Sequence, residues 1–309
     1  MPRPLTLAVL GATGAVGRAI VQVLEEQELP VASLRLLARK DSAGEEIEFR
    51  GDALEVEEAA PRAFRGVDVA FFAVPAAAAR EWAPKARAEG CRAVVDASAA
   101  FRSDAEVPLV VASVNPAALE GFGERGLVAG PEAAAILLAT ALEPLRQAAG
   151  LMRVAAATLH AASGSGEPAV RELEAEVADL MNGREPDPPI ESPHRVAFNL
   201  VPHVGSFEPG GRTDEESRTA AEVRRVLGES ELPLSVTSVR VPVFFAHTQL
   251  VWLRTRRKLP VEEARQALRK GAGLKLVDDP AERVYPMPML AVNDNAVLVG
   301  RVREDVSQE

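Results

Sequence analysis

The chain has 309 residues, of which 47% are hydrophobic, and its 35 Lys and Arg against 45 Asp and Glu give a net charge of −10. This composition indicates a folded protein of two domains or one large one, and excludes intrinsic disorder. The acidic balance argues against nucleic acid or an anionic membrane as the main partner, although a local basic pocket could still bind a phosphate.

The one cysteine, Cys91, excludes an internal disulfide and a cysteine-based metal cluster. No HxxxH pattern or paired acidic cluster suggests another metal site. Met1–Pro4 carries no charged-then-apolar leader, and no apolar run is long enough to span a bilayer. We therefore expect a cytoplasmic protein without a bound metal.

The first half of the chain alternates between short apolar runs and helical patterns. The expected strands are Leu5–Leu10, Ser33–Leu37, Val67–Val74, Ala93–Asp96, Leu109–Ala112 and Gly126–Ala129. A helical pattern follows the first strand, and another covers Ala76–Glu89. This alternation predicts an α/β domain with a doubly wound, Rossmann-type parallel sheet.

The pattern changes in the second half, where strands are longer and βαβ units are few. The expected strands are Arg153–His160, Ser235–Val243, Gln249–Arg254 and Val297–Val302, with helices at Val170–Met181, Asp214–Leu227 and Val261–Lys270. Such a pattern predicts an α+β domain with a mixed or antiparallel sheet covered by helices. We place the domain boundary near residue 132, which gives domains of residues 1–132 and 133–309.

Three glycines, Gly11, Gly14 and Gly17, stand at three-residue spacing between the first strand and a helix. Such a loop lets the backbone approach a pyrophosphate, and the helix N-terminus supplies unpaired N–H groups and a partial positive charge. The alternative is a tight turn that binds nothing. The position of the loop at the start of an alternating α/β domain favours nucleotide binding.

The segment Arg39–Gly44 follows the second strand, where a dinucleotide fold contacts the adenosine ribose. An acidic residue there favours a 2′-hydroxyl, whereas basic and small hydroxyl residues favour a 2′-phosphate. Arg39, Lys40 and Ser42 surround Asp41, so the signal is mixed, and a solvated loop is the alternative.

Two further segments end strands with residues that could contact a ligand. Arg102, in the segment DASAAFR, could hold a phosphate or carboxylate through two hydrogen bonds, or form a surface salt bridge. Thr158–Gly166 (TLHAASGSG) contains small residues that allow close backbone approach. Its His160 is either an acid or base or a structural histidine.

The segment Arg240–His247 (RVPVFFAH) offers an arginine for a carboxylate and a histidine for general acid or base chemistry. Residues seven apart on an extended strand face opposite sides, so these two side chains meet only if the chain bends between them, as Pro242 allows. His194 and His203 occur in loop sequence and are interpreted as surface histidines.

The segment Gly130–Ile136 (GPEAAAI) is a strand-to-helix turn in the middle of the chain, where an α/β enzyme would expose a reactive side chain. Three alanines, beginning at Ala133, fill it, and alanine can neither attack a substrate nor move a proton. Taken alone, the segment is a helix start rich in good helix formers.

These segments, in this order, resemble the aspartate-semialdehyde dehydrogenase family over nearly the whole chain. The motifs that carry the resemblance are GATGAVG, SAG, VDASAAFR, PLVVASVNP, SGSG, VAFNLVP, EES–R, SVRVPVFFAH and VGRVRED. The resemblance implies a Rossmann NADP domain and an α+β domain that binds substrate and forms a homodimer. It also implies the reversible reductive dephosphorylation of aspartyl phosphate, in which a cysteine attacks, hydride passes between a thiohemiacetal and NADP(H), and phosphate enters or leaves a thioester.

The resemblance also implies roles for individual residues. The implied cofactor-binding residues are Gly11, Thr13, Gly14, Ala15, Val16, Gly17, Arg39, Ser42, Ser163 and Gly164. The implied substrate-binding residues are Arg102, His160, Glu215, Arg218 and Arg240, and His247 takes the acid/base position. The resemblance implies NADP as the cofactor. Asp41 stands where the family usually has a basic residue, so NAD is an alternative.

The resemblance breaks at GPEAAAI, which stands in place of the family's N-P-N-C-S/T turn. Ala133 takes the place of the cysteine, Glu132 replaces an asparagine, and His160 stands where a glutamine is usual. Cys91 lies at the start of a strand and is no substitute. The covalent route needs a thiolate. The pattern is similar to the Usg-type homologues, a branch that lacks the catalytic cysteine.

Three hypotheses follow. The first is a non-catalytic or differently catalytic homologue that binds a nucleotide and a small-molecule ligand and forms a homodimer. The second is an active NAD(P)-dependent oxidoreductase on another small substrate, with His160, Glu132 or His247 as acid or base. The third is a scaffold or regulatory partner.

Overall fold

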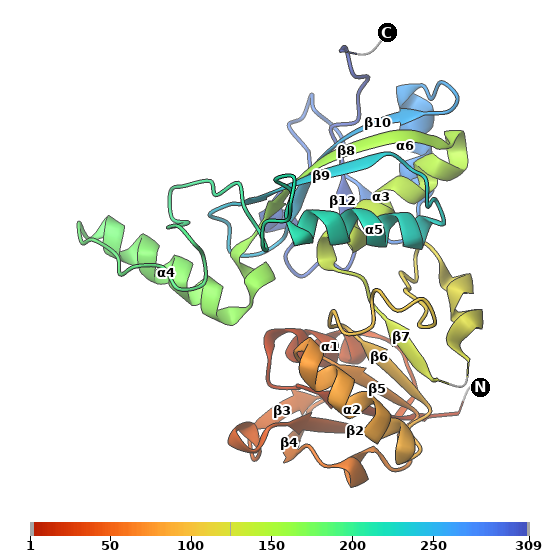
Figure 1. The fold of residues 1–309 in the computed structure, drawn as a ribbon, viewed down its shortest axis with the longest axis vertical. Helices are drawn as coiled ribbons and strands as arrows, with labels where there is room; N and C mark the ends of the chain where they lie inside the picture. Colours follow the sequence, from red (N-terminus) through yellow and green to blue (C-terminus); the bar gives the residue numbers. More distant parts are fainter. Residues whose placement is uncertain (1–2, 124, 308–309) are drawn as a thin grey trace. The chain divides into compact units, whose positions relative to one another are not determined.

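A computed structural model describes residues 3–123 and 125–307. Met1 and Pro2, in which the sequence analysis expects no leader, lie outside the described residues. The chain separates into two compact units (Figure 1). The first comprises residues 1–110 and 116–131, and the second comprises residues 111–115 and 132–309. The short segment 111–115, which the sequence places in the first domain, therefore belongs to the second unit.

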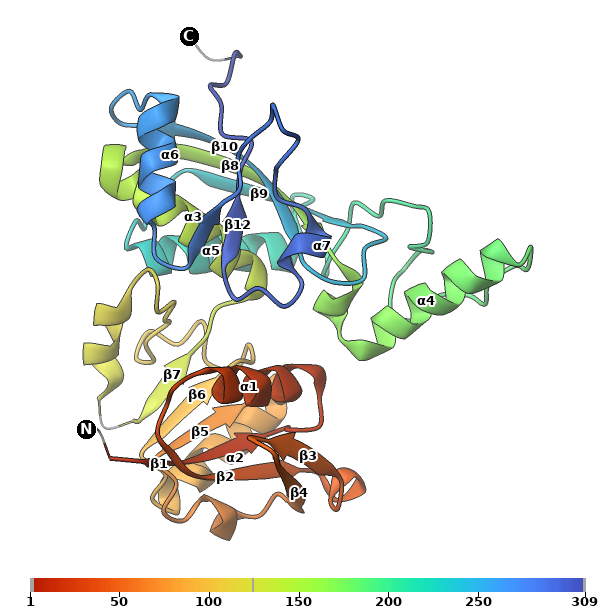
Figure 2. The same cartoon turned by 180° about the vertical axis from the view of Figure 1, so that it is seen from behind.

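The first unit contains a seven-stranded sheet in the order β3-β4-β2-β1-β5-β6-β7. Its strands are β1 (Leu5–Leu10), β2 (Val31–Ala38), β3 (Glu46–Phe49), β4 (Asp52–Glu58), β5 (Val69–Phe72), β6 (Ala93–Asp96) and β7 (Leu127–Ala129). All neighbours pair in parallel except β3 with β4. Helices α1 (Ala15–Glu26) and α2 (Ala76–Ala88) cover opposite faces of the sheet (Figures 1 and 2). The doubly wound Rossmann-type fold is confirmed.

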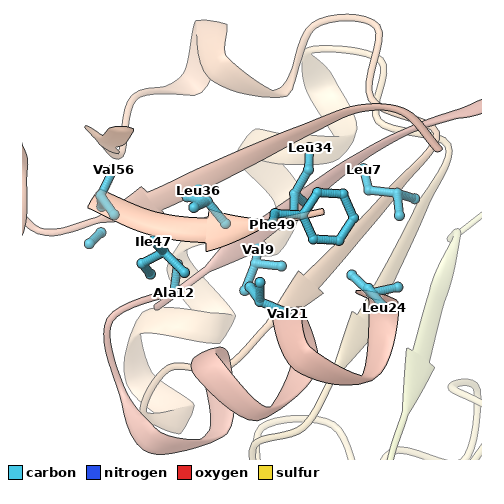
Figure 3. Packing of buried hydrophobic residues seen from close by; sticks show 11 residues of the cluster. Leu7, Val9, Ala12, Val21, Leu24, Leu34, Leu36, Ile47, Phe49 and Val56 are labelled. Atoms are coloured by element: carbon cyan, nitrogen blue, oxygen red, sulfur yellow. The ribbon is translucent and has the colours of Figure 1, made fainter. Parts of the chain in front are cut away.

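The core on the α1 side of this sheet is built from side chains that alternate along the strands (Figure 3). Leu7 and Val9 of β1 are fully buried, and they belong to the same cluster as Val21 and Leu24 of α1. Positions two apart on a strand share a face, and positions three apart on a helix share a side, so both patterns present one apolar surface. This packing fixes the start of α1 against the end of β1.

Two of the seven strands have no counterpart in the sequence expectation. β3 (EIEF) and β4 (DALEVEE) are rich in glutamate and largely exposed; β3 is the edge strand of the sheet, and β4 lies next to it. Charged residues are common on edge strands, where they oppose aggregation, and they hide the strand signal.

The expected strand Leu109–Ala112 is wrong. Only one isolated bridge, from Leu109 to Ala129, joins this segment to the sheet. Val107, Leu109 and Val111 are buried alternately, which gives the sequence a strand-like pattern. The chain then turns, and the side chain of Asn115 accepts a hydrogen bond from the Val111 N–H at 2.8 Å.

The second unit contains a mixed three-stranded sheet in the order β10-β8-β9, as expected. β8 (Leu151–His160) pairs in parallel with β9 (Leu234–Arg240) and antiparallel with β10 (Thr248–Thr255). Helices α3 (Ala133–Ala149) and α5 (Asp214–Leu227) pack against each other, α3 contacts β10 and β8, and α5 contacts β9.

Smaller elements complete the second unit. They are the 3-10 turn η4 (Ala162–Ser165), α4 (Glu167–Met181), α6 (Val261–Lys270), α7 (Pro288–Ala291) and the parallel pair β11 (Leu274–Leu276) and β12 (Val297–Val299). α4 extends away from the three-stranded sheet in both views (Figures 1 and 2). Among the described residues, none of the helices has the length and apolar character that crossing a membrane requires.

The buried face of the three-stranded sheet changes from apolar to polar toward the carboxyl ends of β8 and β9. Thr158 lies opposite Ser238, and His160 lies opposite Arg240. All four side chains are buried. Buried polar groups are costly unless they are hydrogen-bonded, so a cluster of this kind at the end of two parallel strands marks a candidate site.

Candidate functional site

A hydrogen-bond network joins His160 of β8, Ser238 of β9 and Glu215 of α5. The Ser238 hydroxyl donates to one carboxylate oxygen of Glu215, and its oxygen lies 3.2 Å from His160 Nε2. The other carboxylate oxygen of Glu215 lies 3.4 Å from His160 Nε2 and accepts from the Thr219 hydroxyl at 3.1 Å. Since Ser238 donates to Glu215, its oxygen is left to accept a hydrogen bond from the Nε2–H of His160.

Burial shifts the protonation of this network toward neutral forms. Desolvation, with smaller contributions from His247 and Arg240, lowers the pKa of His160 to about 3. Desolvation also raises the pKa of Glu215, although hydrogen bonds from Ser238 and Thr219 oppose it. The 3.4 Å separation of His160 and Glu215 would suit an ion pair, but the environment keeps the imidazole neutral at pH 7.

Arg240 and His247 meet at Gly164 of η4. A methyl group on Gly164 would lie 2.6 Å from His247 Cε1 and 3.5 Å from Arg240 Nη1, so only glycine leaves both side chains in place. The chain leaves β9 after Arg240, and Ala246 has a positive φ of 69° directly before His247. The chain therefore bends between the two residues, as their spacing required.

Arg240 is 91% buried, since the exposed fraction of the residue is 9%, and its guanidinium donates to the Ala161 carbonyl and to the Ser165 hydroxyl. In the described part of the chain, no carboxylate oxygen lies within 4.0 Å of a guanidinium nitrogen of Arg240. Burial lowers the pKa of Arg240, but an arginine keeps its proton at neutral pH. The charge of Glu215 opposes this lowering, but a buried cation that forms no salt bridge with the described carboxylates is suited to bind an anionic ligand group.

His247 is held as an acceptor at one ring nitrogen. Its Nδ1 accepts a hydrogen bond from the Ala161 N–H at 3.0 Å, so the neutral ring carries its proton on Nε2. Burial, and then the charge of Arg240, lower the pKa of His247 to about 4. The His160 and His247 rings are 5.0 Å apart between centroids. Two neutral imidazoles therefore lie side by side, next to a cation.

Ala133 is the first residue of α3, and it is exposed, whereas Ala134 and Ala135 are buried. Contacts to the backbone fix this helix start. The Glu132 N–H donates to a Glu222 carboxylate oxygen at 2.6 Å, and the Gln249 amide donates to the Ala134 carbonyl at 2.9 Å. Gln249 also donates to the hydroxyl of Thr158, two residues before His160, at 3.1 Å, so it links the backbone of α3 at Ala134 to β8.

Arg218 of α5 lies beside this helix start. It donates to Asp214 at 2.7 Å, and its Nε is 3.8 Å from a carboxylate oxygen of Glu132. Burial works to lower the pKa of Arg218, but the carboxylates of Asp214, Glu132 and Glu215 outweigh it and raise the pKa. Arg218 is thus already balanced by acidic groups of the same unit.

Cys91 belongs to the first unit and is fully buried. Its Sγ donates to the Ala93 carbonyl at 3.2 Å, and burial raises the pKa of the thiol. A nucleophilic cysteine needs an accessible thiolate, so Cys91 has a structural environment. No group of three or more His, Cys, Asp or Glu in residues 3–123 and 125–307 could hold a metal ion.

The first unit carries the glycine loop between β1 and α1. A methyl group on Gly11 would lie 2.3 Å from the Ala73 carbonyl oxygen, and one on Gly17 would lie 2.1 Å from the Gly11 carbonyl oxygen. Both glycines are therefore required by close backbone contacts. Gly14 caps α1, and no acidic side chain occupies the first turn. Gly14, Ala15 and Val16 are exposed, so the helix N-terminus can accept a phosphate.

The remaining predicted residues of the first unit lie at the carboxyl edge of its sheet. Arg102 donates to the Gly130 carbonyl at 3.0 Å and to the Ala97 carbonyl at 2.8 Å, which holds it beside the ends of β6 and β7. Arg39 caps the 3-10 turn η1 (Lys40–Ser42) after β2. Thr13 accepts a hydrogen bond from Arg18 on its carbonyl at 3.1 Å.

Comparisons with known proteins identify both halves of the chain. The family described as "Semialdehyde dehydrogenase, NAD binding domain" matches residues 6–122, and "Semialdehyde dehydrogenase, dimerisation domain" matches residues 142–309. The aspartate-semialdehyde dehydrogenase of Aquifex aeolicus (strain VF5) is 37% identical over 300 residues, which cover 97% of this chain and 88% of that protein. The chain belongs to the aspartate-semialdehyde dehydrogenase family.

Other members of the aspartate-semialdehyde dehydrogenase family agree along the whole chain. The Legionella pneumophila protein is 38% identical over 308 residues, covering 99% of this chain and 88% of that protein. The crystal structure of Vibrio cholerae aspartate semialdehyde dehydrogenase II complexed with ASA matches with a TM-score of 0.94 at 32% identity, and the match covers 99% and 90% of the two chains. The family and its two-part fold are therefore confirmed.

The structure adds three residues that the sequence interpretation missed. Ser238, Gln249 and Glu222 support the polar cluster and the start of α3. Ser238 precedes Arg240 by two positions on a strand and thus shares its face, so strand periodicity could have indicated it. Glu222 and Gln249 contact backbone atoms far away in sequence, and no local pattern reports such contacts.

The two neutral histidines predict how stability depends on pH. Because their folded-state pKa values, about 3 and about 4, lie below the ordinary value of 6.5, the unfolded chain binds protons between about pH 6.5 and 4 that the folded chain does not. The free energy of unfolding should therefore fall as pH falls through this window, by about 1.4 kcal/mol per pH unit for each histidine.

His160→Gln should flatten this slope by about 1.4 kcal/mol per pH unit below about pH 6 in urea unfolding followed by circular dichroism. The exposed His194 supplies the matched control, because His194→Gln should leave the slope unchanged. An equal slope in the wild type and His160→Gln would contradict a neutral, buried His160.

Proposed function

We propose that this protein is an aspartate-semialdehyde dehydrogenase homologue that binds a nicotinamide dinucleotide and a small carboxylate but cannot follow the covalent route. The observation that supports the proposal is that Ala133, the first residue of α3, is exposed and carries a side chain that cannot act as a nucleophile. Arg240 supplies an unpaired cation for the carboxylate, and His247 supplies a neutral imidazole.

The position of Ala133 is suited to a nucleophile. The N-terminus of a helix stabilises negative charge, and it lowers the pKa of a thiol placed there. Alanine offers no such group, and Cys91 is buried in the other unit. Losing a nucleophile removes many orders of magnitude of rate, so the family's thioester chemistry is not expected here.

The cofactor part of the proposal rests on the glycine loop and the N-terminus of α1, which suit a pyrophosphate. A nicotinamide cofactor bound there would supply a hydride donor or acceptor. Arg39 and Ser42 favour the 2′-phosphate of NADP, whereas Asp41 favours NAD, so we propose NADP with NAD as the alternative.

Gly14→Ala should weaken cofactor binding at least about tenfold, because its methyl group would occupy the space that the pyrophosphate needs. The same methyl group meets nothing closer than 3.6 Å in the protein, so the fold should be unaffected. Isothermal titration with NADPH and NADH would measure the effect. The control is Gly121→Ala, which adds a methyl group with nothing within 4 Å. Absence of wild-type binding to either cofactor at millimolar concentration would end the cofactor proposal.

A second candidate function is an oxidoreductase that needs no covalent step. The neutral imidazole of His247 favours it, since its Nε2 carries a proton and can donate a hydrogen bond to a substrate oxygen. In this case Arg240 would hold the substrate and the Nε2–H of His247 would stabilise the oxygen whose charge changes during hydride transfer.

Ala133→Cys should create a reactive thiol, because residue 133 is exposed at a helix N-terminus. At pH 7, iodoacetamide should alkylate Cys at 133 at least about tenfold faster than the buried Cys91, as followed by mass spectrometry. The triple variant Ala133→Cys, Glu132→Asn, His160→Gln restores the three family residues. With aspartate semialdehyde, phosphate and NADP it should show hydride transfer that the wild type lacks.

Two results would change this view. An unreactive thiol at 133, together with no turnover by a triple variant that still binds cofactor, would contradict the assignment of the nucleophile position. Turnover of small aldehydes or ketones by the wild type would favour the second candidate.

A homodimer is the third part of the proposal. α3 and α5 pack on one face of the three-stranded sheet, and large apolar side chains on its other face are exposed. Leu250 and Trp252 of β10 lie opposite Ala157 and Ala155 of β8 on this other face, and they are 47% and 46% exposed. An apolar sheet face in a unit that matches a dimerisation domain is suited to a second copy of the chain.

Trp252→Glu should convert a dimer into a monomer in size-exclusion chromatography with light scattering, because it places a charge in the apolar face. Met181→Glu is the matched control, since Met181 is 72% exposed at the end of α4. A wild type that is monomeric, or a Trp252→Glu variant that stays dimeric, would refute this interface. Copurification of a different dehydrogenase on the same surface would support the scaffold alternative.

A further inference from the structure

Arg218 and Arg240, the two arginines of the candidate site in the second unit, differ in how their charges are balanced. Arg240 is buried and has no carboxylate within salt-bridge distance in the described part of the chain. Arg218 is 44% exposed and has two: Asp214 at 2.7 Å and Glu132 at 3.8 Å. An anionic ligand group would therefore gain more at Arg240 than at Arg218, where it would compete with the protein's own carboxylates.

Carboxylates of the protein also offset the partial positive charge at the start of α3, next to Arg218. A helix N-terminus ordinarily attracts anions through its free N–H groups. Here the Glu132 N–H is bonded to the Glu222 carboxylate at 2.6 Å, and Glu222 is 95% buried, since its exposed fraction is 5%. The Glu132 side chain adds a second negative charge at the same place, 26% exposed.

We propose that Glu132 is a specificity-determining residue that excludes phosphate and other anions from the subsite at Arg218. The ligand of the site is then a small carboxylate, bound at Arg240, whose other end is neutral or cationic and carries no phosphoryl group. This inference rests on the proposed function for the ligand site, but it does not depend on cofactor binding or on the chemistry at residue 133.

The electrostatic argument sets the size of the effect. A phosphate bound at Arg218 would carry its charge within a few ångström of Glu132, which itself lies 3.8 Å from the guanidinium. At partly exposed sites, repulsion over such a distance lowers affinity by roughly one to two orders of magnitude, less at high salt. Removing the charge of Glu132 should therefore open the subsite without moving the backbone, because Glu222 holds the backbone N–H of Glu132.

Isothermal titration of inorganic phosphate into the full chain at low ionic strength tests the proposal. Glu132→Gln should bind phosphate at least about tenfold more tightly than the wild type. Adding Arg218→Ala to Glu132→Gln should remove that gain, which locates the phosphate at Arg218 rather than at Arg102, Arg240 or the glycine loop. Glu231→Gln, which changes the net charge equally at an exposed residue between α5 and β9, should bind like the wild type.

Each alternative result overturns the proposal. A wild type that binds phosphate as tightly as Glu132→Gln would show that Glu132 does not exclude anions. No phosphate binding by Glu132→Gln would show that Arg218 forms no anion subsite. A gain that persists without Arg218, or that Glu231→Gln shares, would assign the effect elsewhere or to net charge.

Thermal unfolding confirms that each variant is folded, and Glu132→Asn provides a second variant if Glu132→Gln is unstable. Failure of the cofactor titrations would leave the phosphate result interpretable. The two proposals can therefore fail separately.

Discussion

The parallel pairing of β8 with β9 is the constraint on which the candidate site depends. Its register places Thr158 opposite Ser238 and His160 opposite Arg240 on the face that α3 and α5 cover. A shift of one residue in β9 relative to β8 would turn Ser238 and Arg240 to the opposite face of the sheet. Buried polar groups also cost free energy unless they are hydrogen-bonded, so the register is tolerable only because Glu215 of α5 completes the network.

The start of α3 is held in place by contacts to its backbone. Glu222 contacts the backbone N–H of Glu132, and Gln249 contacts the backbone carbonyl of Ala134. Neither contact uses the side chain of residue 133. The helix start is therefore held in place whatever side chain it carries, and chemistry and structure are separable at this position.

The fold was predictable where burial produces a simple period. α5 and α6 have the bounds expected from their amphipathic patterns, and β1 and β6 match their apolar runs. The glutamate-rich edge strand β3 and its neighbour β4 were missed, because their exposed residues give no strong hydrophobic signal. Alternating burial at Val107, Leu109 and Val111 imitated a strand, since periodicity reports which side chains are buried and not whether a neighbouring strand pairs with them.

By itself, the sequence determined the family, the order of the two parts and the identity of the candidate side chains. It could do so because the motifs are local and each keeps its chemistry in a short segment. Only the tertiary structure decided which charges meet. Arg240 and His247 converge at Gly164 only after the chain bends, and Arg218 pairs with Glu132 only because α5 packs beside the start of α3. Electrostatic energy depends on distance in space, and residues far apart in sequence acquire that distance only through folding.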